Sequence, residues 1–174
     1  GEFQDRELDG DFYLTTQEQA LIATVADAYH AVGKPVVMVL NSGNVVETAS
    51  WRDQVDAIVL VWQGGQEAGH ALADVLVGKV NPSGKLPTSF SLRYDDVPSA
   101  AHFPGQRLAG ATEHFVGPLS KGWDSEVTYA EGIYVGYRHY CSHQQAVAYP
   151  FGFGLSYTVF TYSPLSISDS VFQG

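Results

Sequence analysis

The segment AIVLVWQGGQEAGHALADVLVGKVNPSGKLPTSF, residues Ala57 to Phe90, carries the clearest structural pattern in the chain. Its first six residues are all apolar, as in a strand of a parallel sheet that helices cover on both faces. After a pair of glycines, apolar residues recur at the spacing of one helical face until Gly78, which suits the left-handed cap conformation. A turn-rich segment, residues 81–84, then precedes a second extended run. The pattern predicts a strand, a helix and a second strand.

Three further elements are predicted upstream of this unit. Residues 15–18 (TTQE) have the spacing of a capping box, so a helix begins there, with apolar residues from Leu21 onward on one face, and it ends at Gly33. Residues 36–40 (VVMVL) are a second uninterrupted apolar run, typical of a buried parallel strand, and residues 47–55 have room for a short helix. This order predicts an α/β fold, a three-layer α/β sandwich with a mostly parallel sheet.

Composition limits the possible partners of the chain. With 174 residues, of which 45% are hydrophobic, the chain suits one domain with a sizeable core. Its formal net charge of -10 predicts no nucleic acid and no membrane as partner, because nucleic acids and anionic membranes favour Lys and Arg. Cys141 is the only cysteine, which excludes an internal disulfide. The chain begins Gly-Glu-Phe rather than with Met, so we interpret it as a piece of a longer protein.

Other segments have weaker patterns. Residues 1–10 are polar and predict a solvated loop, and residues 91–128, rich in Gly, Pro and polar residues, predict a long loop that is functional or packed on a neighbour. Residues 129–140 are dense in tyrosine and predict ordered structure. The alternation of residues 158–167 predicts a final strand.

Two glycine motifs suggest nucleotide binding but have the wrong spacing. Residues 78–85 (GKVNPSGK) have five residues between their glycines and Leu86 after the lysine, whereas a P-loop needs four residues and then Ser or Thr. Residues 64–69 (GGQEAG) lie where a dinucleotide fingerprint lies, yet their glycines do not follow G-x-G-x-x-G. We therefore interpret Gly65 and Gly69 as sites of close packing between helix and sheet.

No metal or covalent site is predicted from the remaining motifs. His139, Cys141 and His143 alternate, which on an extended chain places them on one side, but no second cysteine or nearby carboxylate completes four ligands. Cys141 has no identifiable partner that would make it a nucleophile, and the chain contains no G-x-S-x-G elbow. On composition alone, Glu2 is one carboxylate among many in a polar terminus.

Five segments, in this order, resemble the C-terminal α/β sandwich domain of glycoside hydrolase family 3, most closely its β-glucosidase-like members. They are residues 36–43 (VVMVLNSG), 61–69 (VWQGGQEAG), 71–90 (ALADVLVGKVNPSGKLPTSF), 129–137 (YAEGIYVGY) and 149–158 (YPFGFGLSYT). The resemblance implies that residues 1–157 form this domain, incomplete at its N-terminal side and with the long loop at about 91–128. Residues 158–174 would begin a truncated fibronectin type III-like domain.

The resemblance also implies a function. Family members place a (β/α)8-like barrel before the sandwich; the barrel supplies an Asp nucleophile, and β-glucosidase-like members take a Glu acid/base from a Gly-Glu-x-x-Asp-Arg stretch. The chain opens Gly1-Glu2-Phe3-Gln4-Asp5-Arg6, which makes Glu2 the candidate catalytic acid/base of a retaining β-glucosidase acting on terminal non-reducing β-D-glucosyl residues. Such an enzyme needs two carboxyl groups about 5 Å apart, so this chain alone is expected to be inactive.

The implied partners are a β-glucoside or oligosaccharide substrate and the barrel of the same protein, with no cofactor and no metal. Some residues depart from the family pattern: Phe3 stands where a Gly usually follows the acid/base Glu, Gly64 replaces a common Pro, and residues 141–146 replace an Asp-containing loop. Two alternatives stay open. One is a nucleotide-binding α/β domain that uses the turn from Gly64 to Gly69, and the other is a non-catalytic sandwich that braces a neighbouring domain or binds sugar.

Overall fold

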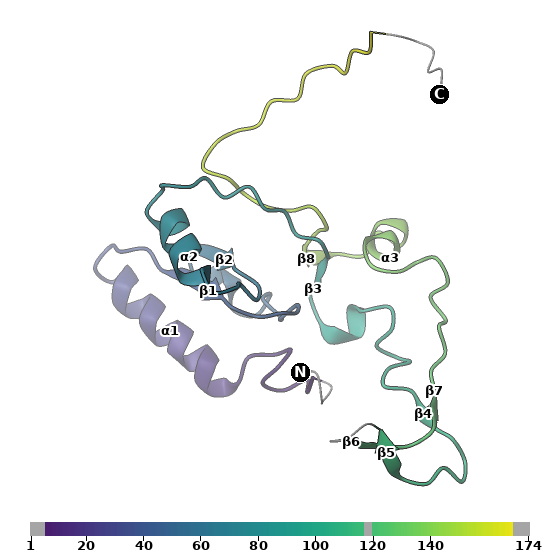
Figure 1. Cartoon of the computed structure of the whole chain (residues 1–174). Coiled ribbons are helices and arrows are strands. Elements are labelled where there is room, and N and C mark those ends of the chain that lie inside the picture. Colours follow the sequence, from purple (N-terminus) through teal and green to yellow (C-terminus); the bar gives the residue numbers. More distant parts are fainter. Residues whose placement is uncertain (1–5, 117–119, 169–174) are drawn as a thin grey trace.

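A computed structural model describes residues 6–116 and 120–168, and Figure 1 shows their arrangement. Helix α1 (Thr16–His30) begins with the predicted capping box: the Glu18 amide donates to Thr15 Oγ1 (3.2 Å) and the Thr15 amide donates to Glu18 Oε2 (2.8 Å). These hydrogen bonds from Thr15 lower the pKa of the Glu18 carboxyl. Gly33 follows with φ +67°, the left-handed conformation expected after a helix. Both ends of the helix are therefore confirmed.

The buried face of α1 differs from the predicted one. The helix buries Ile22 and Ala26, whereas Leu21 is 63% exposed. The predicted face is therefore wrong for the described residues, because it is one position out of register with the surface that packs on the rest of the chain. The apolar side chains on the other face of α1 remain uncovered.

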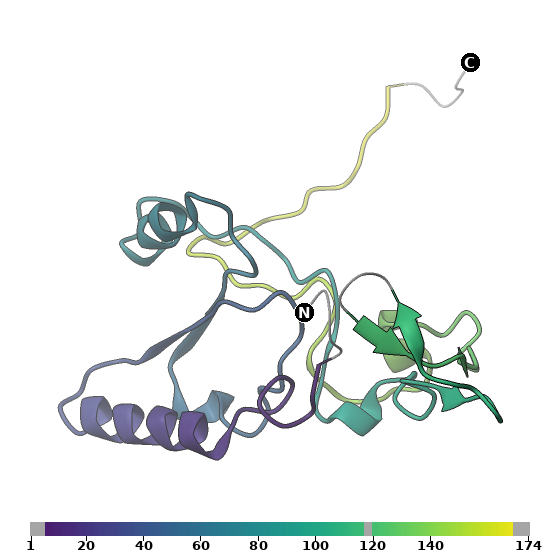
Figure 2. The ribbon, with the colours of Figure 1, turned by 60° about the horizontal axis from the view of Figure 1, so that its bottom comes forward.

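The two predicted parallel strands are confirmed. Strand β1 (Val37–Leu40) pairs in parallel with β2 (Ala57–Leu60), in the register Val37 to Ala57 through Leu40 to Leu60. Both views show this pair between α1 and helix α2 (Ala68–Leu76) (Figures 1 and 2). The predicted short helix between the strands is the 3-10 turn η1 (Arg52–Gln54).

The strand predicted at the end of the central segment forms a different pairing from the one expected. After α2 the chain turns at Gly78, which has φ +74°, and its next strand is β3 (Phe90–Ser91). This strand pairs antiparallel with β8 (Val147–Tyr149), which lies far along the chain, rather than joining β1 and β2. Among the described residues, the parallel part of the sheet is therefore confined to one strand pair.

The segment predicted to be a long irregular loop contains short regular elements. The 3-10 turn η2 (Tyr94–Asp96) comes first. Strand β4 (Gln106–Arg107) then pairs antiparallel with β7 (Ser125–Glu126), and β5 (His114–Val116) pairs antiparallel with β6 (Ser120–Gly122). In Figure 1 these four strands lie on the opposite side of the molecule from α1 and α2.

The C-terminal part contains one more helix and an extended segment. Helix α3 (Tyr137–Ser142) confirms regular structure in the last four residues of the tyrosine-rich segment, whereas residues 129–136 form turns and irregular chain. Beyond β8, the predicted strand at residues 158–167 is wrong, because the chain there forms no strand. Val159, Tyr162 and Leu165 are more than 90% exposed, and the segment extends away from the rest of the molecule (Figure 1). A strand needs a partner, and the described chain offers none beside this segment.

The core lies where the N-terminal part meets β3 and β8. Trp51 is its most buried large side chain, and its indole Nε1 donates to the backbone oxygen of Glu47 (2.8 Å). Phe90 packs edge-on against Trp62 and Tyr149, with ring centroids 6.3 and 6.1 Å apart. The buried apolar residues are Phe12, Ile22, Ala26, Val46, Trp51, Phe90, Tyr140 and Ala148.

Candidate functional site

The described chain begins with a hydrogen-bonded turn, residues 6–13, which we call the N-terminal turn. Arg6 donates from Nη1 to the backbone oxygen of Val45 (2.7 Å) and from Nη2 to that of Asp11. The Glu7 amide donates to Asp11 Oδ2 (2.9 Å). Residues 7–10 are exposed and residues 6–10 contain no helix or strand, so the predicted solvated loop is confirmed there, with hydrogen bonds that hold it in a turn. The predicted catalytic residue, Glu2, lies just before this turn and outside the described residues.

The N-terminal turn is packed against two later segments. Phe12 is buried, and its backbone oxygen accepts from the Glu47 amide (2.8 Å). The Tyr13 hydroxyl accepts from the Tyr94 amide (3.0 Å), and the Phe12 ring lies edge-on to the Tyr94 ring, with centroids 5.6 Å apart. The turn is thus fixed to the loop after β1 and to η2.

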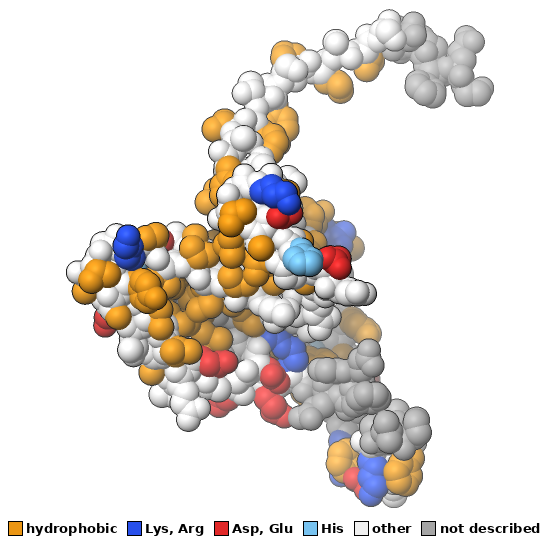
Figure 3. Space-filling model, turned by 60° about the vertical axis from the view of Figure 1, so that its left-hand side comes forward, with side chains coloured by type: hydrophobic (Ala, Val, Ile, Leu, Met, Phe, Trp, Pro, Cys, Tyr) orange, Lys and Arg blue, Asp and Glu red, His pale blue; other side chains and the backbone are white. Residues whose placement is uncertain are grey.

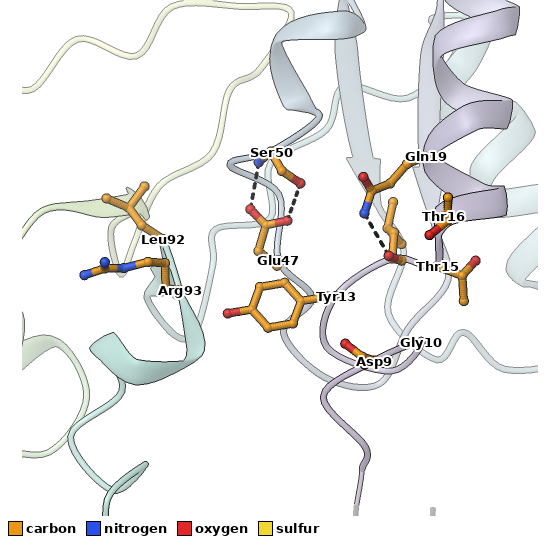
Figure 4. A pocket seen from close by; sticks show the side chains of 11 residues that line it. Asp9, Gly10, Tyr13, Thr15, Thr16, Gln19, Glu47, Ser50, Leu92 and Arg93 are labelled. Atoms are coloured by element: carbon orange, nitrogen blue, oxygen red, sulfur yellow. Dashed lines mark hydrogen bonds between the residues drawn. The ribbon is translucent and has the colours of Figure 1, made fainter.

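A cavity of about 650 Å³, which we call the Tyr13 cavity, lies on one side of the N-terminal turn. In Figure 4 the Tyr13 phenol points across it toward Arg93, with Glu47 nearby. Its lining residues are Asp9, Gly10, Tyr13, Leu14, Thr15, Thr16, Gln19, Glu47, Ser50, Leu92 and Arg93. The volume is within the range of small-molecule sites, so the carboxylates beside it are candidates for acid/base catalysis.

Two carboxylates are buried among the described residues, and both are already hydrogen-bonded. Glu47 Oε1 accepts from the Ser50 amide (2.7 Å) and Oε2 accepts from Ser50 Oγ (2.6 Å), as Figure 4 shows. Asp96 accepts from the Arg93 amide (3.0 Å) and from Arg93 Nη2 (2.9 Å), and these bonds from Arg93 lower the pKa of Asp96. A general acid needs a raised pKa, so Asp96 is suited to a structural role.

A second cavity, of about 320 Å³, is lined in part by Arg6 and Phe12 of the N-terminal turn, and we call it the Arg6 cavity. Burial raises the pKa of the Tyr140 hydroxyl on its wall. Its lining residues are Arg6, Phe12, Asn44, Val45, Thr88, Ser89, Ser91, Tyr94, Val97, Pro98, Ser99, Glu131, Val135, Gly136 and Tyr140. The N-terminal turn therefore contributes to both cavities.

The glycine-rich start of α2 has no features of a nucleotide site. A side chain at Gly65 or Gly69 would meet nothing within 4 Å, so the prediction that these two glycines allow close packing is wrong. Gly64 is the constrained position, because a Cβ there would lie 2.4 Å from the Ala68 Cβ. Glu67, the residue before α2, holds a carboxylate 2.6 Å from His70 Nδ1. A carboxylate there repels phosphate, so the geometry disfavours nucleotide binding.

The GK loop, residues 81–86, is hydrogen-bonded to residues 152–158, which we call the C-terminal segment. Leu86 exchanges backbone hydrogen bonds with this segment: its amide donates to Phe153 O, and its oxygen accepts from Gly152 N, both at 2.8 Å. The Lys85 ammonium donates to the backbone oxygen of Gly154. The loop and the C-terminal segment also approach closely, since a Cβ at Gly154 would lie 2.6 Å from Gly84 O.

The histidine and cysteine motif lies on a helix rather than on an extended chain. His139 belongs to α3, and the His143 ring lies beside the His139 ring, with centroids 4.6 Å apart. His139 Nε2 is 2.9 Å from Gln145 Oε1, and Cys141 is exposed. Throughout residues 6–116 and 120–168, no three His, Cys, Asp or Glu side chains are placed to hold a metal ion. The same residues contain no helix long and apolar enough to cross a bilayer.

Sequence reasoning missed Arg6 and Tyr13 as members of the site. In the sequence, Arg6 stands out only as the last residue of the Gly-Glu-x-x-Asp-Arg stretch. Its contact with Val45 spans 39 residues, a separation that no local pattern reveals. Tyr13 contacts the Tyr94 amide across 81 residues. The one feature of the sequence that points to Arg6 is its fixed spacing from Glu2 in the Gly-Glu-x-x-Asp-Arg stretch.

The chain matches known proteins over most of its length. The model of the family described as "Glycosyl hydrolase family 3 C-terminal domain" matches residues 1–137. Beta-glucosidase B of Emericella nidulans is 42% identical over 149 residues, which cover 84% of this chain and 16% of that protein. An Exo-alpha-(1->6)-L-arabinopyranosidase of Bifidobacterium longum is 36% identical over 157 residues, which cover 90% of this chain and 18% of that protein.

Solved structures agree with these sequence matches. Beta-glucosidase 3B of Thermotoga neapolitana, solved in complex with alpha-D-glucose, is 49% identical, with a TM-score of 0.80, and the match covers 96% of this chain and 22% of that one. Beta-glucosidase of Kluyveromyces marxianus, solved in complex with glucose, is 36% identical, with a TM-score of 0.69. The match covers 86% of this chain and 15% of that one. The chain thus spans about 16–18% of the curated relatives named above.

Proposed function

Because the chain belongs to the family of glycosyl hydrolase family 3 C-terminal domains, we propose that it is part of a retaining β-glucosidase that hydrolyses terminal non-reducing β-D-glucosyl residues. The observation that carries the proposal is the match to beta-glucosidase 3B, with 49% identity over 96% of this chain. The substrate is a β-glucoside or an oligosaccharide. It binds between this domain and an N-terminal barrel domain of the same protein.

In the proposed mechanism, Glu2 is the general acid/base and an Asp of the barrel is the nucleophile. In the first step the Asp carboxylate attacks the anomeric carbon, while the Glu2 carboxyl gives its proton to the leaving oxygen. In the second step the Glu2 carboxylate takes a proton from water, which attacks the same carbon and releases the Asp. The first step requires a protonated acid, and in a site with two carboxyl groups the charge of one raises the pKa of the other.

The N-terminal turn supports this assignment by its position in the chain. Glu2 precedes Arg6 by four residues, and four residues span at most about 14 Å. The acid/base would therefore act within about 14 Å of Arg6, whose side chain lines one of the two cavities. The buried carboxylates Glu47 and Asp96 do not compete for the role, because their oxygens are held by Ser50 and Arg93.

The finer fold is also part of the proposal. An isolated two-stranded parallel pair such as β1 and β2 is marginal by itself, which supports a larger sheet completed by strands that precede this chain. We expect residues 1–157 to form one three-layer sandwich with that mostly parallel sheet. Residues 158–174 would then begin a fibronectin type III-like domain. Later strands of that domain would pair with the extended segment at residues 158–167.

The test of Glu2 is Glu2→Gln in the full-length protein. An alkyl glucoside has a leaving group that needs a proton, whereas a dinitrophenyl glucoside does not. We expect kcat/KM for the alkyl glucoside to fall by about 100-fold or more, and that for the dinitrophenyl glucoside to change much less. Glu7→Gln, the same change in an exposed residue of the N-terminal turn, is the matched control and should leave both rates unchanged. Equal losses for the two substrates in Glu2→Gln would show that Glu2 is not the acid.

A second specificity is favoured by one relative. The Bifidobacterium longum protein is named an arabinopyranosidase, and it matches 90% of this chain at 36% identity. Its substrate is an alternative for the same two-carboxylate reaction. Comparing kcat/KM for nitrophenyl β-D-glucopyranoside and nitrophenyl α-L-arabinopyranoside decides between them. A preference for the arabinopyranoside would overturn the glucosidase assignment while leaving the reaction class intact.

A further inference from the structure

We propose that the Arg6 cavity is a binding site for a small neutral polyol, of which glycerol is a simple example, held by the hydroxyl groups of Ser91 and Tyr140. The site is separate from the proposed hydrolysis and does not depend on the role of Glu2. All the residues assigned to it line the cavity in the described part of the chain.

Ser91, in β3, has a buried hydroxyl on the cavity wall. The residue is 2% exposed, and its Oγ makes no hydrogen bond of normal geometry with any residue of 6–116 or 120–168. Buried hydroxyls are nearly always hydrogen-bonded, because an unsatisfied one loses its bonds to water without replacement. Since Ser91 lines the Arg6 cavity, a hydroxyl of a molecule in the cavity can be its partner.

Tyr140, in α3, supplies a second hydroxyl on the same wall. The residue is 7% exposed. Burial raises the pKa of its hydroxyl while the Ser91 side chain acts in the opposite direction, which means that the two hydroxyls are neighbours. Each hydroxyl can both donate and accept, so one ligand hydroxyl can accept from the first and donate to the second.

The remaining wall also suits a polyol. Three more hydroxyl side chains line the cavity, those of Thr88, Ser89 and Ser99, and Phe12 and Val97 add apolar surface. Small-molecule sites combine apolar walls with a few polar groups that fix the orientation of the ligand. A polyol presents both kinds of surface, because its carbons are apolar and each carries a hydroxyl.

The charges on the wall favour a neutral ligand. Arg6 and Glu131 are the charged residues of the described lining, and their charges are opposite. The Arg6 guanidinium already donates to the backbone oxygens of Val45 and Asp11. An anion would therefore find the cation engaged and would be repelled by the Glu131 carboxylate.

The size of the cavity favours a polyol over a single water molecule. Its volume of about 320 Å³ is at the lower end of the range for small-molecule sites. Water occupies about 30 Å³ per molecule in the liquid, so the space would hold roughly ten of them. A polyol of a few carbons can displace several of these waters and reproduce their hydrogen bonds to the wall.

The experiment follows methyl NMR signals of the full-length protein during a titration with glycerol. Val97 and Val135 line the cavity and are the reporters, and Val75 of α2, which does not line it, is the reference. We expect the reporter shifts to saturate with a Kd on the order of 10 mM. Propan-1-ol has the same number of carbons but one hydroxyl, and should bind at least about 10-fold more weakly.

Two variants test the assigned hydroxyls. Ser91→Ala and Tyr140→Phe each remove one hydroxyl, and each should raise the Kd for glycerol about 3- to 10-fold, the effect of one lost hydrogen bond. Ser83→Ala, the same change as the first in an exposed serine of the GK loop, is the matched control and should leave the Kd unchanged. Glycerol bound elsewhere in the protein would be insensitive to all three changes.

Each other outcome overturns the proposal. Reporter shifts that are absent, or that grow linearly with glycerol, would show that the cavity holds water only. Equal affinity for propan-1-ol would show an apolar site, and an unchanged Kd in both Ser91→Ala and Tyr140→Phe would show that these hydroxyls hold no ligand. If Tyr140→Phe does not fold, Ser91→Ala decides alone. None of these results alters the proposed hydrolysis, which Glu2→Gln tests separately.

Discussion

Asp56 is a single residue that joins the end of a helix to the start of a strand. Its Oδ2 accepts from the Val36 amide (2.7 Å), just before β1, and lies 2.9 Å from His30 Nε2, at the end of α1. The hydrogen bond from Val36, followed by that from His30, lowers the pKa of Asp56 below its ordinary value of 3.8. A carboxyl with a lowered pKa contributes stability above its unfolded pKa and loses it as pH falls.

The pH dependence of this contribution can be measured with Asp56→Asn. At neutral pH the variant should unfold at a lower temperature than the wild type, because it lacks the charge that strengthens both contacts. The difference should shrink as pH falls below about 4 and vanish once Asp56 is protonated in the folded protein. Asp53→Asn is a control on a 91% exposed side chain nearby, and its difference from the wild type should be close to zero. A gap for Asp56→Asn that is constant from pH 7 to pH 3 would contradict this account.

The contact between the GK loop and the C-terminal segment is a property of two paired elements. A Cβ added at Gly154 would lie 2.6 Å from the backbone oxygen of Gly84, and backbone cannot move aside cheaply. Gly154→Ala should therefore push the two segments apart, at a cost of roughly 1–3 kcal/mol. The hydrogen bonds of Leu86 with Phe153 and Gly152 would open more often.

Hydrogen exchange of single amides measures this local opening in the full-length protein. In Gly154→Ala, the Leu86 and Gly152 amides should exchange about 10-fold faster or more, since 1.4 kcal/mol corresponds to a factor of ten. Gly65→Ala is the matched control, because a Cβ there meets nothing within 4 Å. Unchanged protection of both amides in Gly154→Ala would mean that the segments adjust without loss.

Elements with local signals were predictable from the sequence, and elements that depend on distant partners were not. The start of α1 follows from Thr15 and Glu18 alone, and β1 and β2 follow from their apolar runs. By contrast, β3 pairs with β8 more than fifty residues away, and α3 forms where alternation suggested an extended chain. Pairing and helix choice there depend on tertiary contacts, which override local pattern. The contacts of Arg6 and Tyr13 were unpredictable for the same reason.

Across the whole molecule, many large apolar side chains remain at the surface. Leu21 and Val32 of the α1 region are 63% and 68% exposed, and Ile133 is 72% exposed. Figure 3 shows hydrophobic side chains spread over one face and along the C-terminal segment. Exposed apolar surface on this scale marks surfaces that bind other chains or domains. This agrees with the small share of its relatives, 16–22%, that the chain covers.

The proposed division of the two catalytic carboxylates between two domains gives a prediction at the scale of the whole molecule. The 174-residue chain alone should show no turnover of nitrophenyl β-D-glucopyranoside, because retaining hydrolysis needs a second carboxylate about 5 Å from the first. The full-length protein, assayed under the same conditions, should hydrolyse it. Turnover by the isolated chain that is abolished in Glu2→Gln would require both carboxylates to lie within these residues, and would contradict the proposed division.

The hydrogen bonds between residues 81–86 and residues 152–158 also determine how the domain responds to a pulling force. We call this set of hydrogen bonds the clasp. In it, Ser156 Oγ donates to Pro82 O (2.5 Å) and the Tyr157 amide donates to Asn81 Oδ1 (2.8 Å). The Tyr157 hydroxyl also donates to the backbone oxygen of Val75 in α2 (2.8 Å). A pull on the chain beyond residue 158 would therefore load these bonds first. The tension would pass into α2 through Tyr157, and β8 and α3 would bear force only after the clasp had broken.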